Sequence, residues 1–210
     1  KIINQSSIAA GVRRVEALRD KQLEDYEQSL KKDKSKYFLT LSTVQKFTNK
    51  DIGSSISING ICLTLIRAKL IKNKCQIMFY LSPETLRLSN LRFLKKKENV
   101  NIEKSLKFGD EISGHFVQGH VDDCSSISKI NIKQGSWYIN IKYKQKFKKY
   151  IIKKGSIAIN GVSLTIVSVS KNYFQLVIIP HSLKLTNLIN LKKNDMVNVE
   201  FDIILKYLNR

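Results

Sequence analysis

Short apolar stretches separated by polar turns make up the chain from residue 36 onward. Their residues are largely β-branched and aromatic, and each stretch has the length of a single strand. The predicted strands cover residues 37–41, 55–58, 62–66, 76–81, 137–141, 156–159, 164–169 and 174–179. Short strands at this spacing, with turn residues between them, predict an antiparallel barrel or sandwich.

Residues 1–35 follow a different pattern. Between Gly11 and Lys32 the apolar residues recur at steps of three to five positions among arginine, lysine and acidic residues. This period predicts an amphipathic helix. Residues 7–18 also resemble a short stretch late in alanyl-tRNA synthetases, and so short a match brings no catalytic residue with it. We therefore expect residues 1–35 to be an atypical helical leader that is exposed or packed against a partner.

Two similar stretches, residues 57–65 and 158–166, each contain Asn-Gly between apolar flanks. This dipeptide predicts a tight hairpin turn, because asparagine and glycine tolerate a positive φ. Just after the turns the stretches differ, since Cys62 in the first corresponds to Ser163 in the second. A threonine follows each of them two positions later. The exchange of a thiol for a hydroxyl marks both positions as candidates for chemistry.

The similarity between the halves extends beyond the hairpins. Corresponding segments lie about 100 residues apart, which suits a duplicated domain and exceeds the roughly 20–50 residues of a solenoid repeat. The pairs are 37–41 with 137–141, 83–91 with 180–188, and 99–103 with 196–200. We therefore predict an all-β fold of two tandem, homologous six-stranded antiparallel β-barrels of Greek-key type, with a helix at each end of the chain.

The predicted domains divide the chain into four parts. They are the leader at 1–35, an N-terminal barrel at 36–112, a C-terminal barrel at 113–202 and a C-terminal helix at 203–210. Residues 114–122 are expected to open the second barrel. The leucine-rich segments at 86–91 and 183–188 are expected to form short helical turns across the barrel ends.

The net charge of +20, from 37 basic and 17 acidic residues, raises nucleic acid and anionic membranes as partners. The distribution of the lysines argues against such a role, because they are scattered through the turns of the whole chain. A stretch such as residues 144–149 places lysines around an aromatic side chain, which is a weak form of the nucleic-acid-binding pattern. A solvated, lysine-rich surface is expected, and nucleic acid is not an expected partner.

The three cysteines, Cys62, Cys75 and Cys124, are odd in number and lack the spacing of metal ligands. This predicts free thiols in a reducing compartment and no metal site. No run approaches the ~18 apolar residues of a membrane span, and residues 1–30 contain no apolar signal-peptide core. A cytoplasmic protein without membrane association is therefore expected.

Four motifs together carry a resemblance to a known family. They are Gly-His-Phe-Val-Gln-Gly-His-Val-Asp at 114–122, the paired Asn-Gly hairpins, Ile-Pro-His-Ser-Leu-Lys-Leu-Thr-Asn-Leu at 179–188, and Asn-Val-Glu-Phe-Asp at 198–202. In this order and spacing they resemble the riboflavin synthase alpha chain over residues 36–210. The resemblance implies two lumazine-binding barrels and a homotrimer whose active sites lie between subunits. It also suggests an association with lumazine synthase.

The reaction that this resemblance implies is a transfer between two copies of one substrate. Two molecules of 6,7-dimethyl-8-ribityllumazine dismutate, and a four-carbon unit passes from one to the other. The products are riboflavin and 5-amino-6-(D-ribitylamino)uracil, and no cofactor is needed. Two similar pockets would suit two copies of one molecule, and the difference between Cys62 and Ser163 would suit their unequal roles.

The resemblance also implies which residues hold the substrate. In the first pocket they are Cys62, Leu63 and Thr64 with Tyr80, Leu81, Ser82, Pro83, Glu84 and Thr85. In the second pocket they are Ser163, Leu164 and Thr165 with Val177, Ile178, Ile179, Pro180, His181 and Ser182, while Gly119, His120 and Val121 line its mouth. Lys154 is expected to reach across from a neighbouring subunit and, with backbone N–H groups, to meet developing charge.

Five residues are candidates for the chemistry itself. We expect His120, beside Thr165, to transfer the proton of the lumazine 7-methyl group, because imidazole titrates near neutral pH. Ser163, or a water that it holds, is the candidate nucleophile. Cys62 is expected to assist as a polar group, and the Asp202 carboxylate is expected to orient the pocket.

Simpler interpretations of several side chains remain open. Cys62 also suits a small buried position in a core, and His115 suits a structural role. His181 suits a pocket rim as well as ligand binding. Cys75 and Cys124 are expected to be ordinary packing or surface thiols.

The first strand of the N-terminal barrel departs from the family pattern. Family members begin with a Met-Phe-Thr-Gly-Ile/Val segment that supplies this strand and touches the lumazine. We expect it to be missing or replaced here, since only Ala10-Gly11-Val12 is similar to it, and a barrel without it would expose a strand edge. Two alternatives follow for the function. One is a catalytically weakened lumazine- or flavin-binding paralogue, and the more remote one is a basic nucleic-acid-binding β-barrel.

Overall fold

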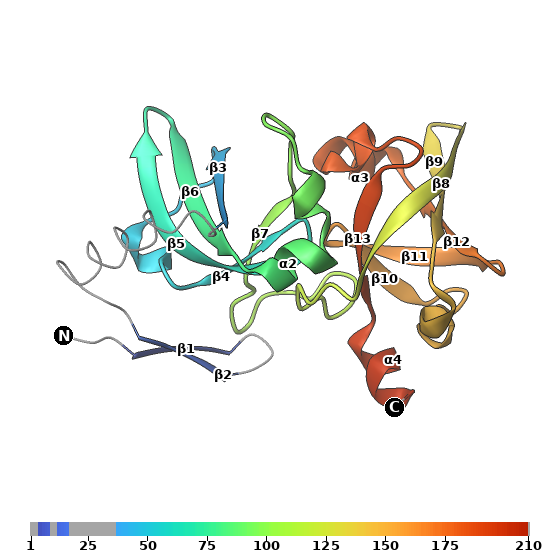
Figure 1. Cartoon of the computed structure of the whole chain (residues 1–210), viewed down its shortest axis with the longest axis horizontal. Helices are drawn as coiled ribbons and strands as arrows, with labels where there is room; N and C mark the ends of the chain where they lie inside the picture. Colours follow the sequence, from blue (N-terminus) through green and yellow to red (C-terminus); the bar gives the residue numbers. More distant parts are fainter. Residues whose placement is uncertain (1–3, 9–11, 17–36, 210) are drawn as a thin grey trace. The chain divides into compact units, whose positions relative to one another are not determined.

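The computed structural model describes residues 4–8, 12–16 and 37–209 (Figure 1). In its N-terminal part, β1 (Asn4–Ile8) and β2 (Val12–Glu16) pair antiparallel. The predicted helix is therefore wrong at residues 12–16, where Val12 and Val15 are β-branched and favour an extended backbone. The rest of that helix, and the end of the predicted leader, lie outside the described residues.

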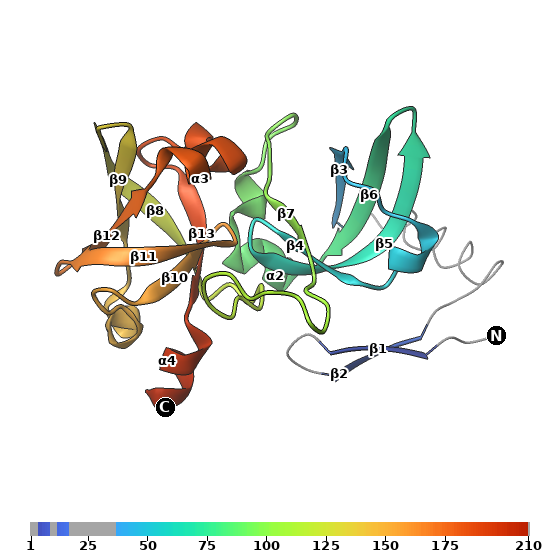
Figure 2. The ribbon, with the colours of Figure 1, turned by 180° about the vertical axis from the view of Figure 1, so that it is seen from behind.

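Residues 123–201 contain a closed barrel of six antiparallel strands. They are β8 (Asp123–Lys133), β9 (Ser136–Lys142), β10 (Ser156–Ile159), β11 (Val162–Val169), β12 (Tyr173–Ile178) and β13 (Met196–Phe201). Around the barrel the order is β10-β11-β12-β9-β8-β13, and pairing of β13 with β10 closes it. Figure 2 shows the barrel from behind, with β11 beside β10. The predicted C-terminal barrel is confirmed, but residues 114–122 are irregular and precede its first strand.

Alternating side chains fill the interior of this barrel. Along β12, Phe174, Leu176 and Ile178 are buried, whereas the residues between them are partly exposed. A period of two is what a strand with one face on a core requires. The same cluster contains buried side chains from all six strands, among them Ile127, Ile139, Ile157, Ile166 and Val199. Burial of each such side chain contributes roughly 1.5–3 kcal/mol, so this core is the main stabilising feature of the barrel.

The first half contains a five-stranded sheet where a six-stranded barrel was predicted. Its strands are β3 (Tyr37–Thr43), β4 (Ser55–Ile58), β5 (Ile61–Ile71), β6 (Lys74–Leu81) and β7 (Ile102–Lys104), in the order β3-β6-β5-β4-β7. This order matches β9-β12-β11-β10-β13 of the barrel. In the barrel, β8 pairs with both β9 and β13, and among the described residues no strand joins β3 to β7 in this way. The expectation of a missing or replaced first strand stays a prediction.

Short helical segments follow the long strands of both halves. In the first half they are α2 (Pro83–Leu88) and η2 (Asn90–Phe93), and in the second they are α3 (Pro180–Leu185) and η4 (Asn187–Asn190), as predicted. Two further 3-10 turns are η1 (Asn49–Asp51) and η3 (Gln145–Tyr150). After the barrel, α4 (Ile203–Leu208) confirms the C-terminal helix. No helix in the described part of the chain has the length and apolar character needed to cross a membrane.

The chain divides into two compact units. The first includes residues 63–85 and 104–106, and the second includes residues 57–62, 86–103 and all those from 107 onward. The second unit therefore contains the barrel and also the Asn59-Gly60 turn of the first half. The compact units do not follow the two halves of the sequence, because this turn packs with its counterpart beside the barrel.

Candidate active site

The two Asn-Gly turns touch each other within the second unit. Asn59 and Asn160 each have a φ of 48°, and Gly60 and Gly161 have φ values of 75° and 83°. These values confirm the tight turns expected from the sequence. A Cβ atom on Gly60 would lie 2.4 Å from the backbone nitrogen of Gly161. Glycine is therefore required at this position both for its conformation and for the close approach of the two backbones.

Gly60→Ala tests this contact. We expect a loss of about 3 kcal/mol or more in the free energy of unfolding, because a backbone clash adds to the roughly 1–2 kcal/mol cost of a left-handed alanine. Gly109→Ala is the matched control, since Gly109 has a φ of 95° and no atom would lie within 4 Å of its Cβ. Urea unfolding of both variants measures the difference. Equal losses would show that the turns do not depend on their mutual contact.

Six asparagines surround these turns in two matching sets, Asn59, Asn90 and Asn101 from the first half and Asn160, Asn187 and Asn198 from the second. Within each set, one asparagine holds the turn next to it. The backbone nitrogen of Asn101 donates to Asn59 Oδ1 at 2.9 Å, and that of Asn198 donates to Asn160 Oδ1 at 2.9 Å. Each turn is thereby tied to the strand region that follows in its own half.

The same asparagines also link the halves. Asn198 Nδ2 donates to the Asn59 carbonyl at 2.8 Å, and Asn101 Nδ2 donates to the Asn160 carbonyl at 2.9 Å. The backbone nitrogen of Asn90 donates to Asn198 Oδ1 at 2.6 Å. In the corresponding contact, the Asn187 nitrogen donates to Asn101 Oδ1 at 2.8 Å. Each half thus satisfies backbone groups of the other, which need partners because they are removed from water.

One irregular segment, residues 114–120, touches both positions that follow the turns, and we call it the strap. At one end, His115 Nδ1 lies 2.7 Å from Ser163 Oγ. Gly114 allows this approach, since a Cβ there would lie 2.5 Å from the same oxygen. At the other end, the carbonyl of Gly119 accepts the backbone N–H of Cys62 at 2.8 Å. The strap therefore brings the His115 side chain into contact with Ser163 and holds the backbone of Cys62 by a hydrogen bond, which we call the backbone clamp.

The histidine on Ser163 is His115, whereas the sequence pointed to His120. Burial lowers the pKa of His115, and the negative charge of Asp202 partly opposes this effect. The imidazole is therefore neutral near pH 7 and can accept a proton. Its Nε2 atom is buried without a hydrogen-bond partner among the described residues. The side chain of His120 is exposed.

The buried carboxylate of Glu200 binds the backbone of the strap. Glu200 of β13 is 3% exposed, and its two oxygens accept the backbone N–H groups of Gln118 at 2.8 Å and Gly119 at 2.9 Å. Burial raises the pKa of Glu200, while these hydrogen bonds, the His120 N–H and the charge of Lys206 act in the opposite direction. The carboxylate is a strong acceptor for consecutive N–H groups in a place that water does not reach.

The residues predicted for the second pocket gather along β11 and β12 in the second unit. Ser163, Leu164 and Thr165 lie on β11, and the pairing of Ile166 with Leu176 directs them toward the end of β12. That end supplies Val177 and Ile178, followed by Ile179, Pro180, His181 and Ser182 at the start of α3. Gly119 is buried, Val121 is half-buried and Lys154 is exposed. Asp202 caps α4, where its Oδ1 accepts the Ile204 N–H at 3.0 Å.

The residues predicted for the first pocket, from Leu63 to Thr85, all lie in the first unit. The pairing of Leu65 with Phe79 sets Leu63 and Thr64 of β5 alongside Tyr80 and Leu81 of β6. At the start of α2, Ser82 Oγ lies 2.9 Å from Thr85 Oγ1, and Pro83 and Glu84 are exposed. Cys62 is half-buried and belongs to the second unit.

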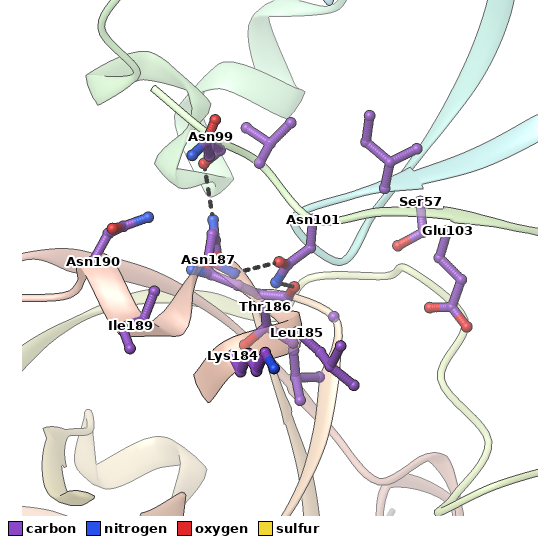
Figure 3. A pocket seen from close by; sticks show the side chains of 15 residues that line it. Ser57, Asn99, Asn101, Glu103, Lys184, Leu185, Thr186, Asn187, Ile189 and Asn190 are labelled. Carbon is purple, nitrogen blue, oxygen red and sulfur yellow. Dashed lines mark hydrogen bonds between the residues drawn. The ribbon is translucent and has the colours of Figure 1, made fainter. Parts of the chain in front are cut away.

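A pocket of about 630 Å³ opens beside the asparagines. Figure 3 shows Asn187 in its wall, bonded to Asn99 and Asn101. The other lining residues come from 100–103, 160–162 and 184–190, together with Ser57. None of the residues predicted for the substrate lines this pocket. Asn101 therefore borders open space, whereas its counterpart Asn198 is 1% exposed.

The cysteines are all free thiols, as predicted. Cys75 is 2% exposed, and burial raises the pKa of the Cys124 thiol to about 11. Both are inert at neutral pH for these reasons, which agrees with an ordinary packing role. Cys62 is half-buried and lies at the end of the strap, where the Gly119 carbonyl accepts its backbone N–H.

Comparison with known proteins gives a family for this arrangement. The lumazine binding domain family matches residues 7–105 and 118–202. The riboflavin synthase of Actinobacillus pleuropneumoniae is 35% identical over 172 residues, which are 82% of this chain and 78% of the relative. The chain belongs to the riboflavin synthase family. Another member, the riboflavin synthase of Buchnera aphidicola subsp. Schizaphis graminum (strain Sg), is 39% identical over 173 residues, with 82% of this chain and 81% of the relative covered.

Solved structures show the same fold. LumP complexed with riboflavin superposes with a TM-score of 0.65 at 23% identity, over 78% of this chain and 88% of that chain. LumP complexed with 6,7-dimethyl-8-(1'-D-ribityl) lumazine gives a TM-score of 0.60 at 22% identity, over 73% and 83%. The lumazine-binding β fold of this riboflavin synthase family member is thereby confirmed.

Membership of the riboflavin synthase family confirms the function class expected from the sequence. The chain is a transferase-type enzyme of a lumazine-binding family, and the relatives favour neither a weakened paralogue nor a nucleic-acid-binding barrel. The family match begins at residue 7, inside the segment predicted to be an atypical helical leader. The roles of individual site residues stay predictions.

Sequence reasoning missed three features of the site. His115 was assigned a structural role, Glu200 was not singled out, and the asparagines other than those of the turns were not connected. A signal for His115 was present, since Gly114 and His115 open the same motif that contains His120. The cross-links among the asparagines depend on packing between the halves, which no local pattern reveals.

Proposed function

We propose that the chain forms riboflavin from two molecules of 6,7-dimethyl-8-ribityllumazine by transfer of a four-carbon unit. The second product is 5-amino-6-(D-ribitylamino)uracil. The observation that carries this proposal is the 2.7 Å contact between Ser163 and His115. It supplies an acid–base pair beside the hairpin of a barrel that belongs to the riboflavin synthase family.

Ser163 and His115 can move a proton between them. With the imidazole proton on Nε2, Nδ1 accepts the proton of the Ser163 hydroxyl, and the charge of Asp202 stabilises the imidazolium that forms. The serine oxygen, or a water that it holds, can then add to C7 of one lumazine. In the alternative in which Ser163 keeps its proton, the neutral imidazole of His115 can instead remove the acidic 7-methyl proton. His120, exposed on the strap, stays a second candidate for that proton transfer.

The neighbouring residues suit recognition of a planar ring with a polyhydroxyl chain. Thr165 is exposed on β11 two residues after Ser163, so its hydroxyl is open to a ribityl chain. Thr64 has the same exposure on β5 after Cys62. Backbone groups along a strand edge supply the donors and acceptors that a pteridine ring requires. The two proposed binding sites therefore share an exposed threonine and a strand edge, and they differ in the residue after the turn, Cys62 or Ser163.

We also propose a homotrimer as the active form. One face of α4 exposes Ile204, Tyr207 and Leu208 by 54%, 60% and 75%, and apolar side chains gathered on a helix favour burial against another copy. Lys154 is exposed and free to act in a neighbouring subunit. The association with lumazine synthase and the cytoplasmic location are further proposals that rest on the family resemblance.

We further propose that the halves, 36–112 and 113–202, arose by internal duplication. The shared strand order supports this origin. So do the register shifts between Leu65 and Arg67 in β5 and between Ile166 and Ser168 in β11, which fall at corresponding places.

A direct assay tests the proposed reaction. The purified full chain is incubated with 6,7-dimethyl-8-ribityllumazine, and riboflavin is followed by its absorbance and fluorescence while the uracil product is measured by chromatography. We expect equal amounts of the two products. Tight binding without turnover would favour the weakened paralogue. A salt-sensitive shift of tRNA or DNA without lumazine binding would favour the basic nucleic-acid-binding barrel.

A further inference from the structure

The strap has no regular secondary structure, yet it meets both chemically distinct positions of the second unit. His115 contacts Ser163, and four residues later Gly119 contacts Cys62. Backbone hydrogen bonds of a helix or strand do not fix such a segment. Its conformation must therefore come from side chains that bind its N–H and carbonyl groups.

Glu200 supplies this anchor. Its two carboxylate oxygens accept consecutive N–H groups of the strap, from Gln118 and Gly119, at 2.8 Å and 2.9 Å. No neutral side chain offers two acceptor atoms in this geometry, because a glutamine has one oxygen and would turn an amine toward a second donor. The anchored residue Gly119 is the one whose carbonyl accepts the Cys62 N–H. The chain of contacts runs from Glu200 through Gly119 to Cys62 without a gap.

Burial of the Glu200 carboxylate costs solvation free energy, and comparison with the first half shows where this burial occurs. A charge removed from water destabilises a protein unless its partners compensate for the lost solvation. The position that corresponds to Glu200 in the first half is Glu103, whose side chain is largely exposed, although partial burial raises its pKa. A carboxylate at this point is thus not buried by the fold as such. Near-complete burial is found at Glu200, where the strap donates two N–H groups to the carboxylate.

We propose that Glu200 is a positioning residue for the reaction, which acts through the strap on Cys62 at one end and on the Ser163–His115 pair at the other. This inference rests on the proposed riboflavin synthase activity. Loss of the anchor releases Gln118 and Gly119, so the backbone clamp on Cys62 loosens and His115 loses its fixed distance to Ser163. The barrel itself keeps its core, because Glu200 is not part of the apolar cluster.

Glu200→Gln and Glu200→Asp in the full chain test the proposal. We expect a fall in kcat of about 10-fold or more with a KM within about three-fold, because misplacement of reacting groups by an ångström costs up to ~100-fold in rate. Glu111→Gln is the matched control, since Glu111 is exposed in the segment before the strap and its substitution removes the same charge. This control should keep the kcat of the unaltered protein.

The second readout is the reactivity of the three thiols. Alkylation by iodoacetamide, mapped by mass spectrometry, should become about three-fold faster or more at Cys62 in both Glu200 variants and stay unchanged at Cys75 and Cys124. If Glu200 had a purely structural role, its substitution would instead raise the alkylation rates of all three thiols together.

The outcomes separate the inference from the function on which it rests. An unaltered kcat and an unaltered Cys62 alkylation rate in both Glu200 variants would overturn the positioning role, as would an equal rise at all three thiols. If the unaltered protein forms no riboflavin, the proposed function fails, and the selective change at Cys62 still decides whether Glu200 anchors the strap.

Discussion

Replacing Ser163 by alanine is expected to lower kcat by about 100-fold or more, because a positioned acid–base pair contributes roughly 10²–10⁴-fold to a rate. The change removes the hydroxyl that lies 2.7 Å from His115 Nδ1. It leaves the fold intact, since Ser163 is half-buried and lies outside the apolar core. Steady-state riboflavin formation measures the effect, and urea unfolding should show a difference within about 0.5 kcal/mol.

The two histidines of the strap provide the internal comparison for this result. His115→Gln should lower kcat more than His120→Gln, because only His115 contacts Ser163 in the structure. Burial lowers the pKa of His115, so the neutral base is kept to more acidic pH than an unperturbed imidazole, and kcat should fall only below the usual histidine range. A larger loss in His120→Gln, or full activity in Ser163→Ala, would contradict the assignment of the pair.

Asn198→Ala is expected to destabilise the protein by about 3–5 kcal/mol. The substitution removes the donor to the Asn59 carbonyl and the acceptor for the Asn90 N–H. Each buried group left without a partner costs about 1–3 kcal/mol. Asn198 is 1% exposed, so water does not replace the lost amide. Urea unfolding of the full chain measures the change.

The corresponding residue of the other half serves as the comparison. Asn101 makes the same kind of contacts, to the Asn160 carbonyl and from the Asn187 N–H. It borders the pocket of Figure 3, so water can satisfy these groups and Asn101→Ala should cost only about 1–2 kcal/mol. Asn190→Ala, at an exposed pocket position, should change stability by less than about 0.5 kcal/mol. Equal losses at Asn101 and Asn198 would show that burial does not set the cost.

The strands were predictable from sequence because their signals are local. The eight predicted strands all fall on strands of the structure, and the Asn-Gly turns have the positive φ that their residues favour. The strand β8 was missed, since Asp123–Lys133 mixes serine and lysine with its apolar residues and lacks a clean period of two. The N-terminal helix was wrong at Val12–Glu16, where a period compatible with a helix occurs in β-branched residues that form a strand.

The candidate site was predictable only as far as the hairpins reach. Cys62 and Ser163 were found because they differ within otherwise similar stretches. The choice between His115 and His120 depends on which side chain the strap turns toward β11, and a sequence motif that contains both cannot decide it. Glu200 was missed for a similar reason, because its function arises from two backbone N–H groups more than 80 residues away in the chain.

The contact between the Asn-Gly turns restricts which residues can be replaced during evolution of this chain. The backbone of Gly60 and that of Gly161 each occupy the space that a side chain on the other would need, so neither glycine can be replaced without displacing the backbone of the other. Cys62 and Ser163 stand only two positions beyond these locked glycines. Their side chains face no such mutual restriction. The contact therefore keeps the backbone of both turns constant. The side chains at positions 62 and 163 could become different during evolution without a change in this backbone.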